Sequence, residues 1–352
     1  MGVNKADNVL TARTIARSVL CCLAVLVLAA GCASAQSAEA TAPRIVAIGD
    51  LHGDYDAYRS LIRDSGLADA RGRWTGGDAI FVQTGDIPDR GPDTRKIIGH
   101  LKKLEKQARR KGGAVVALVG NHEAMNMTGD LRYVDPGEYA AFATSRSKRL
   151  RAAYFDAHFD ELQSRYRERD PSLDDEGVRE AFYAEAPLGY LEQRAAWSPT
   201  GELGAWVGAN DAVHVAGDTL FVHGGVSGAY AALSIDEINR RVREALVGGG
   251  DRAILEDEAG PLWYRGLAEE SPQGEADVAA ALAAYGVARI VIGHTPSLAG
   301  IKSLYGGRVI DIDTGISAYY GGPRSYLEIE NGTITAHNNG VATELGGEGG
   351  EQ

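Results

Sequence analysis

Arg44-Ile-Val-Ala-Ile-Gly-Asp-Leu-His-Gly53 joins an apolar, largely β-branched run directly to a turn that carries an aspartate, a histidine and two glycines. Isoleucine and valine favour strands, and glycine permits the sharp backbone turn that ends one. The stretch that follows, Tyr55–Ser65, has its apolar residues at helical spacing. The sequence therefore predicts a strand and then a helix, with polar side chains at the turn between them.

The same order of strand, polar turn and helix recurs along the chain. Ala79–Gln83 leads into Gly85-Asp-Ile-Pro-Asp-Arg-Gly91, and Ala114–Val119 leads into Gly120-Asn-His-Glu123. Thr94–Lys111, which lies between them, has the pattern of an amphipathic helix. Because α/β sheets place their sites at the carboxyl ends of strands, we expect an α/β (α+β) fold in which these turns converge.

Two later blocks also place a histidine beside glycine. Thr219–Val222 leads to His223-Gly-Gly225, and Arg289–Ile292 leads to Gly293-His-Thr295. Carboxylate, imidazole and carboxamide groups together suit Mn, Fe or Zn. Asp86 is central in the order of these blocks, so it is the expected carboxylate shared by two ions. The candidate metal ligands are Asp50, His52, Asp86, Asn121, His223 and His294.

The remaining residues of these blocks suit phosphate chemistry. Two ions roughly 3.5–4 Å apart clamp a phosphate and activate a bridging hydroxide for in-line attack. Arg90 offers a planar fork for phosphate, and Arg265 and Asn121 are further candidate phosphate-binding residues. His122 is the candidate acid for the leaving oxygen, with Asp89 behind it to orient and polarise the imidazole.

Composition narrows the classes of function. The chain has 352 residues, a hydrophobic fraction of 44% and a formal net charge of −12. This composition allows a sizeable core, and the negative charge argues against binding to a nucleic-acid backbone. All three cysteines, Cys21, Cys22 and Cys32, lie near the N-terminus. Cysteine-dependent phosphatase chemistry is therefore excluded from the rest of the chain.

Residues 1–35 have the organisation of a secretory signal peptide. Two arginines precede an unbroken apolar run, Val19–Ala30, and Ala33-Ser-Ala35 provides a small-residue cleavage site. Leu28-Ala-Ala-Gly-Cys32 offers an alternative, because it resembles a lipoprotein signal that ends at a lipidated Cys32. Either signal predicts an exported protein, periplasmic or secreted, with a lipid anchor at Cys32 as its only membrane contact.

The rest of the chain is expected to form one catalytic domain. Residues 36–43 form a tether, residues 44–340 the domain, and residues 341–352 a tail that we expect to be disordered. Within the domain, residues about 130–205 have the pattern of a helical insertion. This insertion either lies over one rim of the site or packs as solvated helices beside the core.

The motifs resemble those of the phosphoprotein phosphatase branch of the calcineurin-like metallophosphoesterases. That branch reads Gly-Asp-x-His-Gly, Gly-Asp-x-x-Asp-Arg-Gly and Gly-Asn-His-Glu, and Pro296 stands where the wider superfamily usually has a second histidine. Within the branch the chain most resembles the bacterial Shewanella-like phosphatases, through Ala124–Tyr133, Gly217–Gly225 and Trp263-Tyr-Arg-Gly266. The resemblance covers about residues 44–340.

The resemblance implies a four-layer α/β/β/α sandwich with a helical insertion and a dinuclear metal centre. It places Asp50, His52 and Asp86 on one ion. The second ion would be held by Asp86, Asn121, His223 and His294. It also implies His122 as the acid with Asp89 behind it, and Arg90 and Arg265 on phosphate.

The leading hypothesis is an exported, dinuclear-metal-dependent phosphomonoesterase that acts on a phosphorylated protein (Ser/Thr, Tyr or both) or on a small phosphomonoester. A dinucleoside polyphosphate hydrolase of the same branch is the alternative, and export argues against it because such nucleotides are mainly cytosolic. A non-catalytic phosphate-binding module is a third hypothesis. A pure binder, however, has no use for the acid His122.

Overall fold

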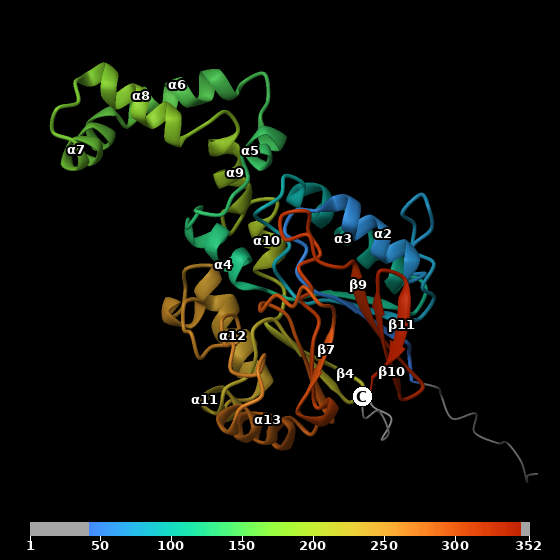
Figure 1. Cartoon of the computed structure of the whole chain (residues 1–352). Coiled ribbons are helices and arrows are strands. Elements are labelled where there is room, and N and C mark those ends of the chain that lie inside the picture. The colour runs from blue at the N-terminus through green and yellow to red at the C-terminus, as the bar shows by residue number, and fades with distance from the viewer. Residues whose placement is uncertain (1–41, 346–352) are drawn as a thin grey trace, which may run out of the picture. The chain divides into compact units, whose positions relative to one another are not determined.

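Two β-sheets lie face to face, and helices cover the outer face of each sheet (Figure 1). Side chains of both sheets meet between them, among them Ala47 and Val82 of one sheet and Phe221 and Ile310 of the other. Residues of the outer faces pack into a second, larger core with the helices. This arrangement is the four-layer α/β/β/α sandwich that the family resemblance implied.

The computed structural model describes residues 42–345, which belong to one compact unit. The predicted signal peptide, residues 36–41 of the tether and residues 346–352 of the tail lie outside the described residues. Within residues 42–345, no helix combines the length and the apolar character that crossing a membrane requires.

The first sheet has six strands in the order β11-β10-β9-β1-β2-β3. Its three ligand-bearing strands run parallel, and the other three form an antiparallel meander beside β1. The bounds are β1 Ile45–Ile48, β2 Ile80–Gln83, β3 Ala114–Ala117, β9 Ser325–Glu330, β10 Thr333–Asn338 and β11 Val341–Glu344.

The second sheet has five strands in the order β4-β5-β6-β8-β7. Its inner strands β5, β6 and β8 are parallel, and an antiparallel strand closes each edge. The bounds are β4 Val213–Ala216, β5 Thr219–Val222, β6 Arg289–Ile292, β7 Lys302–Leu304 and β8 Val309–Asp311.

The alternation of side chains along β1 explains how one strand serves two cores. Ile45 and Ala47 point into the layer between the sheets, whereas Val46 and Ile48 point to the helices. Successive side chains of a strand face opposite sides, so a strand buried on both faces must be apolar throughout. All four residues of β1 are buried. This strand is therefore fixed in register at the centre of the molecule.

Helices α2 and α3 cover the first sheet, and α12 and α13 cover the second. The helix α2 begins at a good cap, since the Asp54 side chain accepts a hydrogen bond from the Ala57 amide. The bounds of the helices outside the insertion are α2 Tyr55–Asp64, α3 Thr94–Arg109, α4 Asn121–Thr128, α11 Gly228–Ala231, α12 Ile235–Leu246, η1 Arg252–Leu255, α13 Pro272–Tyr285 and η2 Tyr305–Gly307.

The predicted helical insertion is present and has two parts. Helices α6, α7 and α8 stand away from the sheets (Figure 1) and enclose a small core of their own that includes Phe155 and Phe182. Helices α5 and α9 form its base, where Phe142 and Trp197 join the main core. The bounds are α5 Pro136–Phe142, α6 Ser147–Ala157, α7 Phe159–Arg169, α8 Asp175–Glu185, α9 Tyr190–Trp197 and α10 Gly204–Val207.

The expectation of disorder from residue 341 onward is wrong for Val341–Glu344, which form β11 and pair with β10. Asn339 and Gly340, with φ of 49° and 81°, make the two-residue turn between these strands. An Asn-Gly pair is a strong signal for such a hairpin. The ordered fold therefore extends at least four residues past the predicted boundary.

Candidate active site

The six predicted metal ligands converge at the carboxyl ends of strands from both sheets. The turns after β1, β2 and β3 supply four of them, and the turns after β5 and β6 supply the two remaining histidines. Each is at most 5% exposed, so this polar group is buried. The structure thus brings together Asp50, His52, Asp86, Asn121, His223 and His294.

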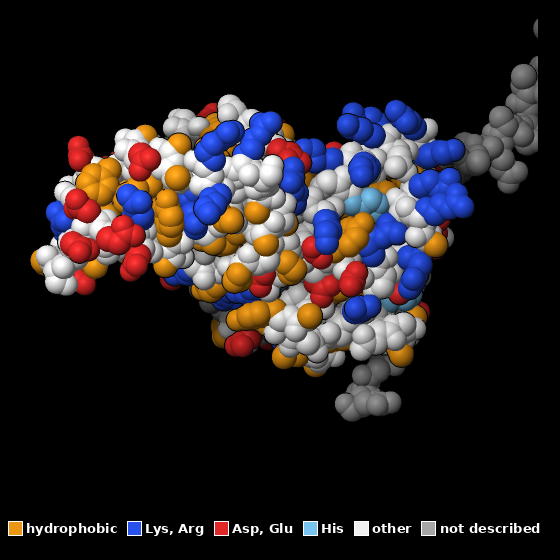
Figure 2. Space-filling view, turned by 90° about the horizontal axis from the view of Figure 1, so that it is seen from above, with side chains coloured by type: hydrophobic (Ala, Val, Ile, Leu, Met, Phe, Trp, Pro, Cys, Tyr) orange, Lys and Arg blue, Asp and Glu red, His pale blue; other side chains and the backbone are white. Residues whose placement is uncertain are grey.

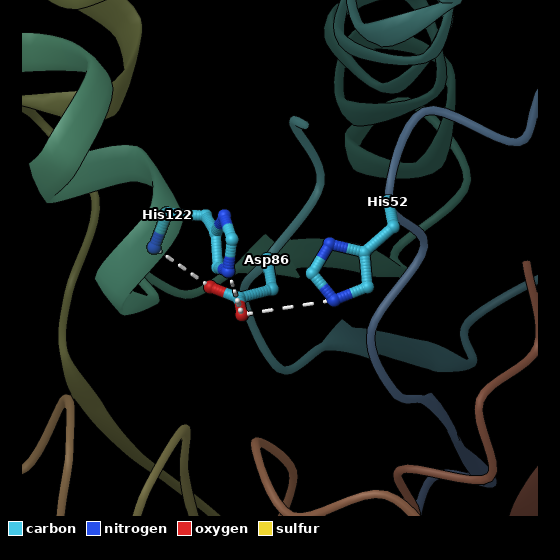
Figure 3. Close-up of side chains that lie close together, drawn as sticks. All are labelled: His52, Asp86 and His122. Carbon is cyan, nitrogen blue, oxygen red and sulfur yellow. Dashed lines mark hydrogen bonds and ion pairs between the residues drawn. The ribbon is translucent and has the colours of Figure 1, made fainter. Parts of the chain in front are cut away.

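Asp86 lies at the centre of the group, between His52 and His122 (Figure 3). Its Oδ2 is 4.0 Å from His52 Nε2 and 3.8 Å from His122 Nε2, and its Oδ1 is 3.3 Å from His223 Nε2. Two sets of side chains could each hold a metal ion: His52, Asp86 and His122, and Asp86, His223 and His294. Asp86 is the member that both sets share.

Hydrogen bonds to backbone carbonyls set the tautomers of two histidines. Nδ1 of His52 lies 3.1 Å from Pro88 O, and Nδ1 of His223 lies 2.9 Å from Thr84 O. A carbonyl only accepts, so each Nδ1 carries a proton and each Nε2 offers a lone pair. These second partners orient the ring nitrogens that face Asp86, as is usual for metal-ligating histidines.

Several polar atoms that could bind metal meet around His223. Burial acts to lower the pKa of His223, but the charge of Asp86 outweighs it, so the pKa is raised. His223 Nε2 lies 2.9 Å from Asn121 Oδ1 and faces Asp86 Oδ1 as well. His294 Nε2 is also buried and has no hydrogen-bond partner among the described residues. Converging acceptors repel one another unless a proton or a cation lies between them. The donor set therefore fits divalent metal ions.

The pKa values of the buried histidines and aspartates also indicate that the site is suited to bind cations. Burial lowers the pKa of His52 to about 3 and that of His294 to about 2, so both are neutral, which is the form that binds metal. Burial, followed by the charges of Asp313 and Asp86, raises the pKa of Asp50 well above its usual range. Buried carboxylates crowded in this way are stabilised in their charged form by cations.

Strained backbone conformations cluster at the turns that carry these side chains. Five of the eight non-glycine residues with positive φ in the described part of the chain belong to the site. The five are His52 (43°), Asp86 (57°), Asp89 (72°), Arg90 (62°) and His294 (68°). Such conformations are unfavourable for residues with a Cβ atom, and they persist where the surrounding structure imposes them. Here they aim side chains of successive turns at one point.

The glycines of the motifs allow the turns to touch. A Cβ atom at Gly120 would lie 2.2 Å from Asp86 Oδ1, and one at Gly53 would lie 2.3 Å from Gly91 O. Both distances are far below van der Waals contact, so the turns after β1, β2 and β3 can meet only through glycine. This packing is the physical reason for glycine beside each ligand.

Glu123, to which the sequence analysis assigned no role, links the turns after β2 and β3 by hydrogen bonds. Its Oε2 accepts from the amides of Gly120 and Asp86 at 2.7 and 2.9 Å, and its Oε1 accepts from the Ile87 amide at 2.8 Å. Burial raises its pKa to about 7. Its place three residues after Gly120 is a common capping position, which was the available signal.

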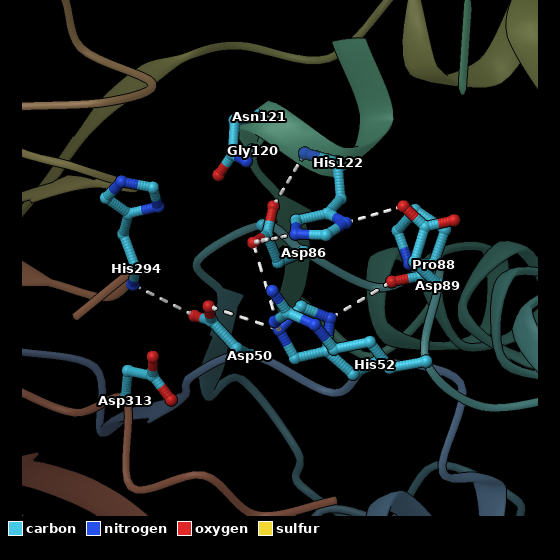
Figure 4. Close-up of polar contacts among 12 residues, drawn as sticks. Asp50, His52, Asp86, Pro88, Asp89, Gly120, Asn121, His122, His294 and Asp313 are labelled. Atoms are coloured by element: carbon cyan, nitrogen blue, oxygen red, sulfur yellow. Dashed lines mark hydrogen bonds and ion pairs between the residues drawn. The ribbon is translucent and has the colours of Figure 1, made fainter. Parts of the chain in front are cut away.

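The predicted acid pair is present. His122 Nδ1 is 2.5 Å from Asp89 Oδ2, and the His122 amide donates to Asp86 Oδ1 at 2.9 Å (Figure 4). Burial acts to lower the pKa of His122, but the negative charges of Asp86 and Asp89 outweigh it, so the pKa is raised. His122 Nδ1 therefore donates to Asp89, and Nε2 faces the centre, where it can carry a second proton.

The two predicted phosphate-binding arginines border the centre at different points. Arg90 Nη1 lies 2.7 Å from His52 Nε2, and the guanidinium lies within 5.6 Å of the ring centres of three tyrosines. These rings are Tyr133, Tyr319 and Tyr320. Arg265 Nη1 donates to His294 O at 2.9 Å and to Thr295 Oγ1 at 3.0 Å.

Two buried aspartates near Asp50 were missed by the sequence reasoning. Asp311 ends β8 and Asp313 lies two residues beyond it, and each keeps one carboxylate oxygen without a hydrogen-bond partner among the described residues. Burial raises their pKa values to about 8 and about 6 respectively. Their position at the end of an apolar run, like that of Asp50 and Asp86, was the available signal.

The comparisons with known proteins agree with this geometry. Residues 43–298 match the family model described as calcineurin-like phosphoesterase. The chain is 35% identical over 289 residues to Shewanella-like protein phosphatase 2 of Arabidopsis thaliana, covering 78% of this chain and 71% of that protein. It is 33% identical over 297 residues to an uncharacterized protein of Schizosaccharomyces pombe, covering 81% and 76% respectively.

A solved structure is similar over most of the chain. The cold-active protein-tyrosine phosphatase of a psychrophilic Shewanella species is 26% identical, with a TM-score of 0.65, and the match covers 86% of this chain and 80% of that one. The chain belongs to the calcineurin-like metallophosphoesterases, which are metal-dependent hydrolases. Within that family it belongs to the phosphoprotein phosphatase branch and to its Shewanella-like members.

Proposed function

We propose that the chain is a dinuclear-metal-dependent phosphomonoesterase that hydrolyses phosphorylated protein side chains. The observation that carries this proposal is the position of Asp86, which is common to both sets of potential metal ligands. A carboxylate shared by two sets suits a pair of ions that act together on one phosphate. The proposed ligands are Asp50, His52, Asp86, Asn121, His223 and His294.

The residues around the centre divide the chemistry among them. Two ions held there would supply an activated water and neutralise phosphate charge. Arg90 and Arg265 bind phosphoryl oxygens and hold the phosphorus for attack from the side opposite the leaving oxygen. As the bond from phosphorus to the leaving oxygen breaks, His122 donates its Nε2 proton to that oxygen. Asp89 holds the Nδ1 proton throughout, and the products are an alcohol and inorganic phosphate.

The rings around Arg90 favour an aromatic phosphoester among the substrates. Tyr133 and Tyr320 lie beside His122 and His52, with ring centres 5.2 and 5.6 Å apart. A phenyl ring whose phosphate reaches Arg90 can pack against these tyrosines. We therefore propose that phosphotyrosine is accepted along with phosphoserine or phosphothreonine. The similar solved structure is named a protein-tyrosine phosphatase.

Surface charge supports an anionic substrate. Lys and Arg side chains gather over α2 and α3 on the face shown in Figure 2, although the whole chain carries a net charge of −12. Exposed members on α3 include Lys96, Lys103 and Lys106. A local positive potential raises the rate at which anionic ligands meet a protein.

The proposal is tested by phosphate release from three substrates. The protein is stripped of metal with a chelator, and release from a phosphotyrosine peptide, a phosphoserine peptide and a dinucleoside polyphosphate is measured before and after Mn is restored. Release from a phosphopeptide that depends on metal is the expected result. Release from the dinucleotide alone would assign the chain to anhydride hydrolysis, and binding of phosphate without any release would show a binding module.

We further propose that the protein is exported and that Cys32 is lipidated. The support is the apolar run Val19–Ala30, whose end overlaps Leu28-Ala-Ala-Gly-Cys32. In a bacterial host the full chain should enter the membrane fraction, and Cys32→Ser should release it in soluble form outside the cytoplasm. A wild-type chain that is already soluble outside the cytoplasm would contradict the anchor and leave cleavage after Ala35 as the alternative.

A further inference from the structure

We infer that Gln193, which the helical insertion supplies, is a positioning residue for the His122–Asp89 pair. This inference rests on the proposed function, because it concerns the acid of that reaction. Asp89 has two oxygens with separate tasks. Oδ2 holds His122 Nδ1, and Oδ1 accepts from Asn126 Nδ2 at 2.9 Å. Asn126 in turn accepts from Gln193 Nε2 through its own Oδ1, at 2.9 Å.

The direction of each hydrogen bond in the series from Gln193 through Asn126 to Asp89 is fixed. Asn126 Nδ2 donates both to Asp89 Oδ1 and to the His122 carbonyl at 3.1 Å. A carboxylate and a carbonyl only accept, so the amide must turn its NH₂ toward them. Its oxygen then faces Gln193, and only a donor at position 193 satisfies it. Gln193 therefore stabilises the orientation of Asn126 in which its NH₂ group holds Asp89.

The outer end of this hydrogen-bond series, at Gln193, is held by the base of the insertion. Gln193 on α9 also lies 3.4 Å, through Nε2, from Glu138 Oε1 on α5, and Glu138 Oε2 accepts from Thr94 Oγ1 at 2.8 Å. Burial raises the pKa of Glu138 to about 7. Arg194 adds a bond from Nη1 to the Asn126 carbonyl at 2.6 Å. Helices α3, α4, α5 and α9 are thus linked behind the acid.

Burial strengthens the effect of this hydrogen-bond series on the His122–Asp89 pair. Asp89, Asn126, Glu138 and Gln193 are all 0% exposed, so water does not compete for their groups. Gln193 Oε1 has no hydrogen-bond partner among the described residues, but the other side-chain oxygen and nitrogen atoms of these four residues are paired. Paired buried groups are held rigidly, and loss of one donor leaves the next acceptor unsatisfied. Without the Gln193 donor, the buried Asn126 oxygen has no partner, which weakens the hold of the Asn126 amide on the Asp89 carboxylate. The imidazole of His122 would then be less well aimed and less strongly polarised.

The test compares Gln193→Met with a matched control. Methionine keeps the length and unbranched shape of glutamine and removes the donor. The control is Gln163→Met on α7, which removes a bond from Gln163 Nε2 to Asp175 Oδ1 in the outer part of the insertion, away from the site. Each variant is assayed with an alkyl phosphate, whose leaving oxygen needs a proton, and with a nitrophenyl phosphate, whose leaving group needs little help.

Gln193→Met is expected to lower kcat on the alkyl phosphate about tenfold, the effect of one lost buried hydrogen bond. The change on the nitrophenyl ester should be about twofold or less, with KM unchanged on both substrates. The basic limb of the kcat profile should move to lower pH, because Asp89 then supports the imidazolium less. Gln163→Met should change none of these quantities.

Two outcomes would overturn the inference. Equal loss on both substrates, together with a lower Tm, would show that Gln193 only stabilises the fold, and unchanged kinetics would show that it does not act on the acid. If the wild type releases no phosphate at all, the proposed function fails separately. The position of the His122 Nδ1 proton signal in NMR spectra then decides, since Gln193→Met must shift it and Gln163→Met must not.

Discussion

At the scale of single residues, the site depends on one carboxylate that faces three histidines. Asp86 contacts His52, His122 and His223 within 4.0 Å. Burial disfavours its negative charge, but the facing histidines lower the pKa of Asp86 well below its usual range. Its Oδ2 faces His52 and His122 and its Oδ1 faces His223, so each oxygen serves one of the two sets of ligands.

Asp86→Asn is predicted to abolish function through metal loss. The substitution keeps the shape of the side chain but replaces one anionic oxygen with an NH₂ group that repels a cation. We expect the bound metal to fall from two ions toward one or none, and kcat/KM to fall at least about 100-fold. Metal content by mass spectrometry and phosphate release are the measurements. Full metal content with normal turnover would show that Asp86 is not the bridge.

His122→Asn separates proton donation from metal binding. The variant should retain its metal, since His122 is proposed as the acid, and hydrolysis of alkyl phosphates should fall by about 10²–10⁴. A nitrophenyl ester should lose much less, because its leaving oxygen is already a weak base. Equal losses on both esters would argue against the acid, and loss of metal would instead place His122 among the ligands.

The sequence predicted those site residues whose residue type and neighbouring sequence are both distinctive. Asp50, Asp86 and His223 each follow an apolar run and border glycine, and this pattern has few structural explanations. Asn126 and Gln193 could not be predicted in the same way, because their roles arise from contact between helices that are 67 positions apart. No local pattern of residues records such a contact.

At the scale of elements, the turns and helix ends carry most of the side chains that define the site. Strands β1, β2 and β3 were predicted from apolar runs within about two residues of their observed ends. The short edge strands β4 and β7 were not, because a strand paired on one side needs only partial apolar character. The insertion was predicted as helical, but the sequence alone did not reveal that α6–α8 pack around a separate core.

Gly99 and Gly120 are predicted to respond oppositely to alanine. Gly99 lies inside α3, and a Cβ atom there meets nothing within 4 Å. Gly99→Ala should raise the free energy of unfolding by about 0.5–1 kcal/mol, because alanine restricts the unfolded chain. Gly120→Ala should lower metal content, because its Cβ would overlap Asp86 Oδ1. Denaturant unfolding and metal analysis test both, and a destabilised Gly99→Ala protein would contradict the reading of α3.

At the scale of the whole molecule, the centre joins two sheets whose strands are not paired with one another, although a backbone bridge links Leu118, just after β3, with Asp211, just before β4. Asp50, His52, Asp86 and Asn121 come from the first sheet, and His223 and His294 from the second. Any ion bound by both sets opposes separation of the sheets. Binding to the native state alone stabilises that state by mass action.

Chelation is therefore predicted to lower the stability of the entire fold. Free metal at about 100 times its dissociation constant would contribute about 2.7 kcal/mol. Removal of the metal should lower Tm by several degrees in calorimetry, and restoring Mn should reverse the change. Asp86→Asn provides the control, because its Tm should hardly respond to chelator. An unchanged wild-type Tm would mean that the ions do not link the two sheets.

The separate core of α6–α8 has an evolutionary consequence. Because these helices bury their apolar residues among themselves, mutations there alter the main core little and are tolerated more freely. Relatives are expected to vary in sequence and length between Ala143 and Pro187, where new binding partners could be acquired. The base helices α5 and α9, by contrast, carry Glu138 and Gln193, and Gln193 is linked to the acid pair through Asn126. Selection should preserve that base while the outer part diversifies.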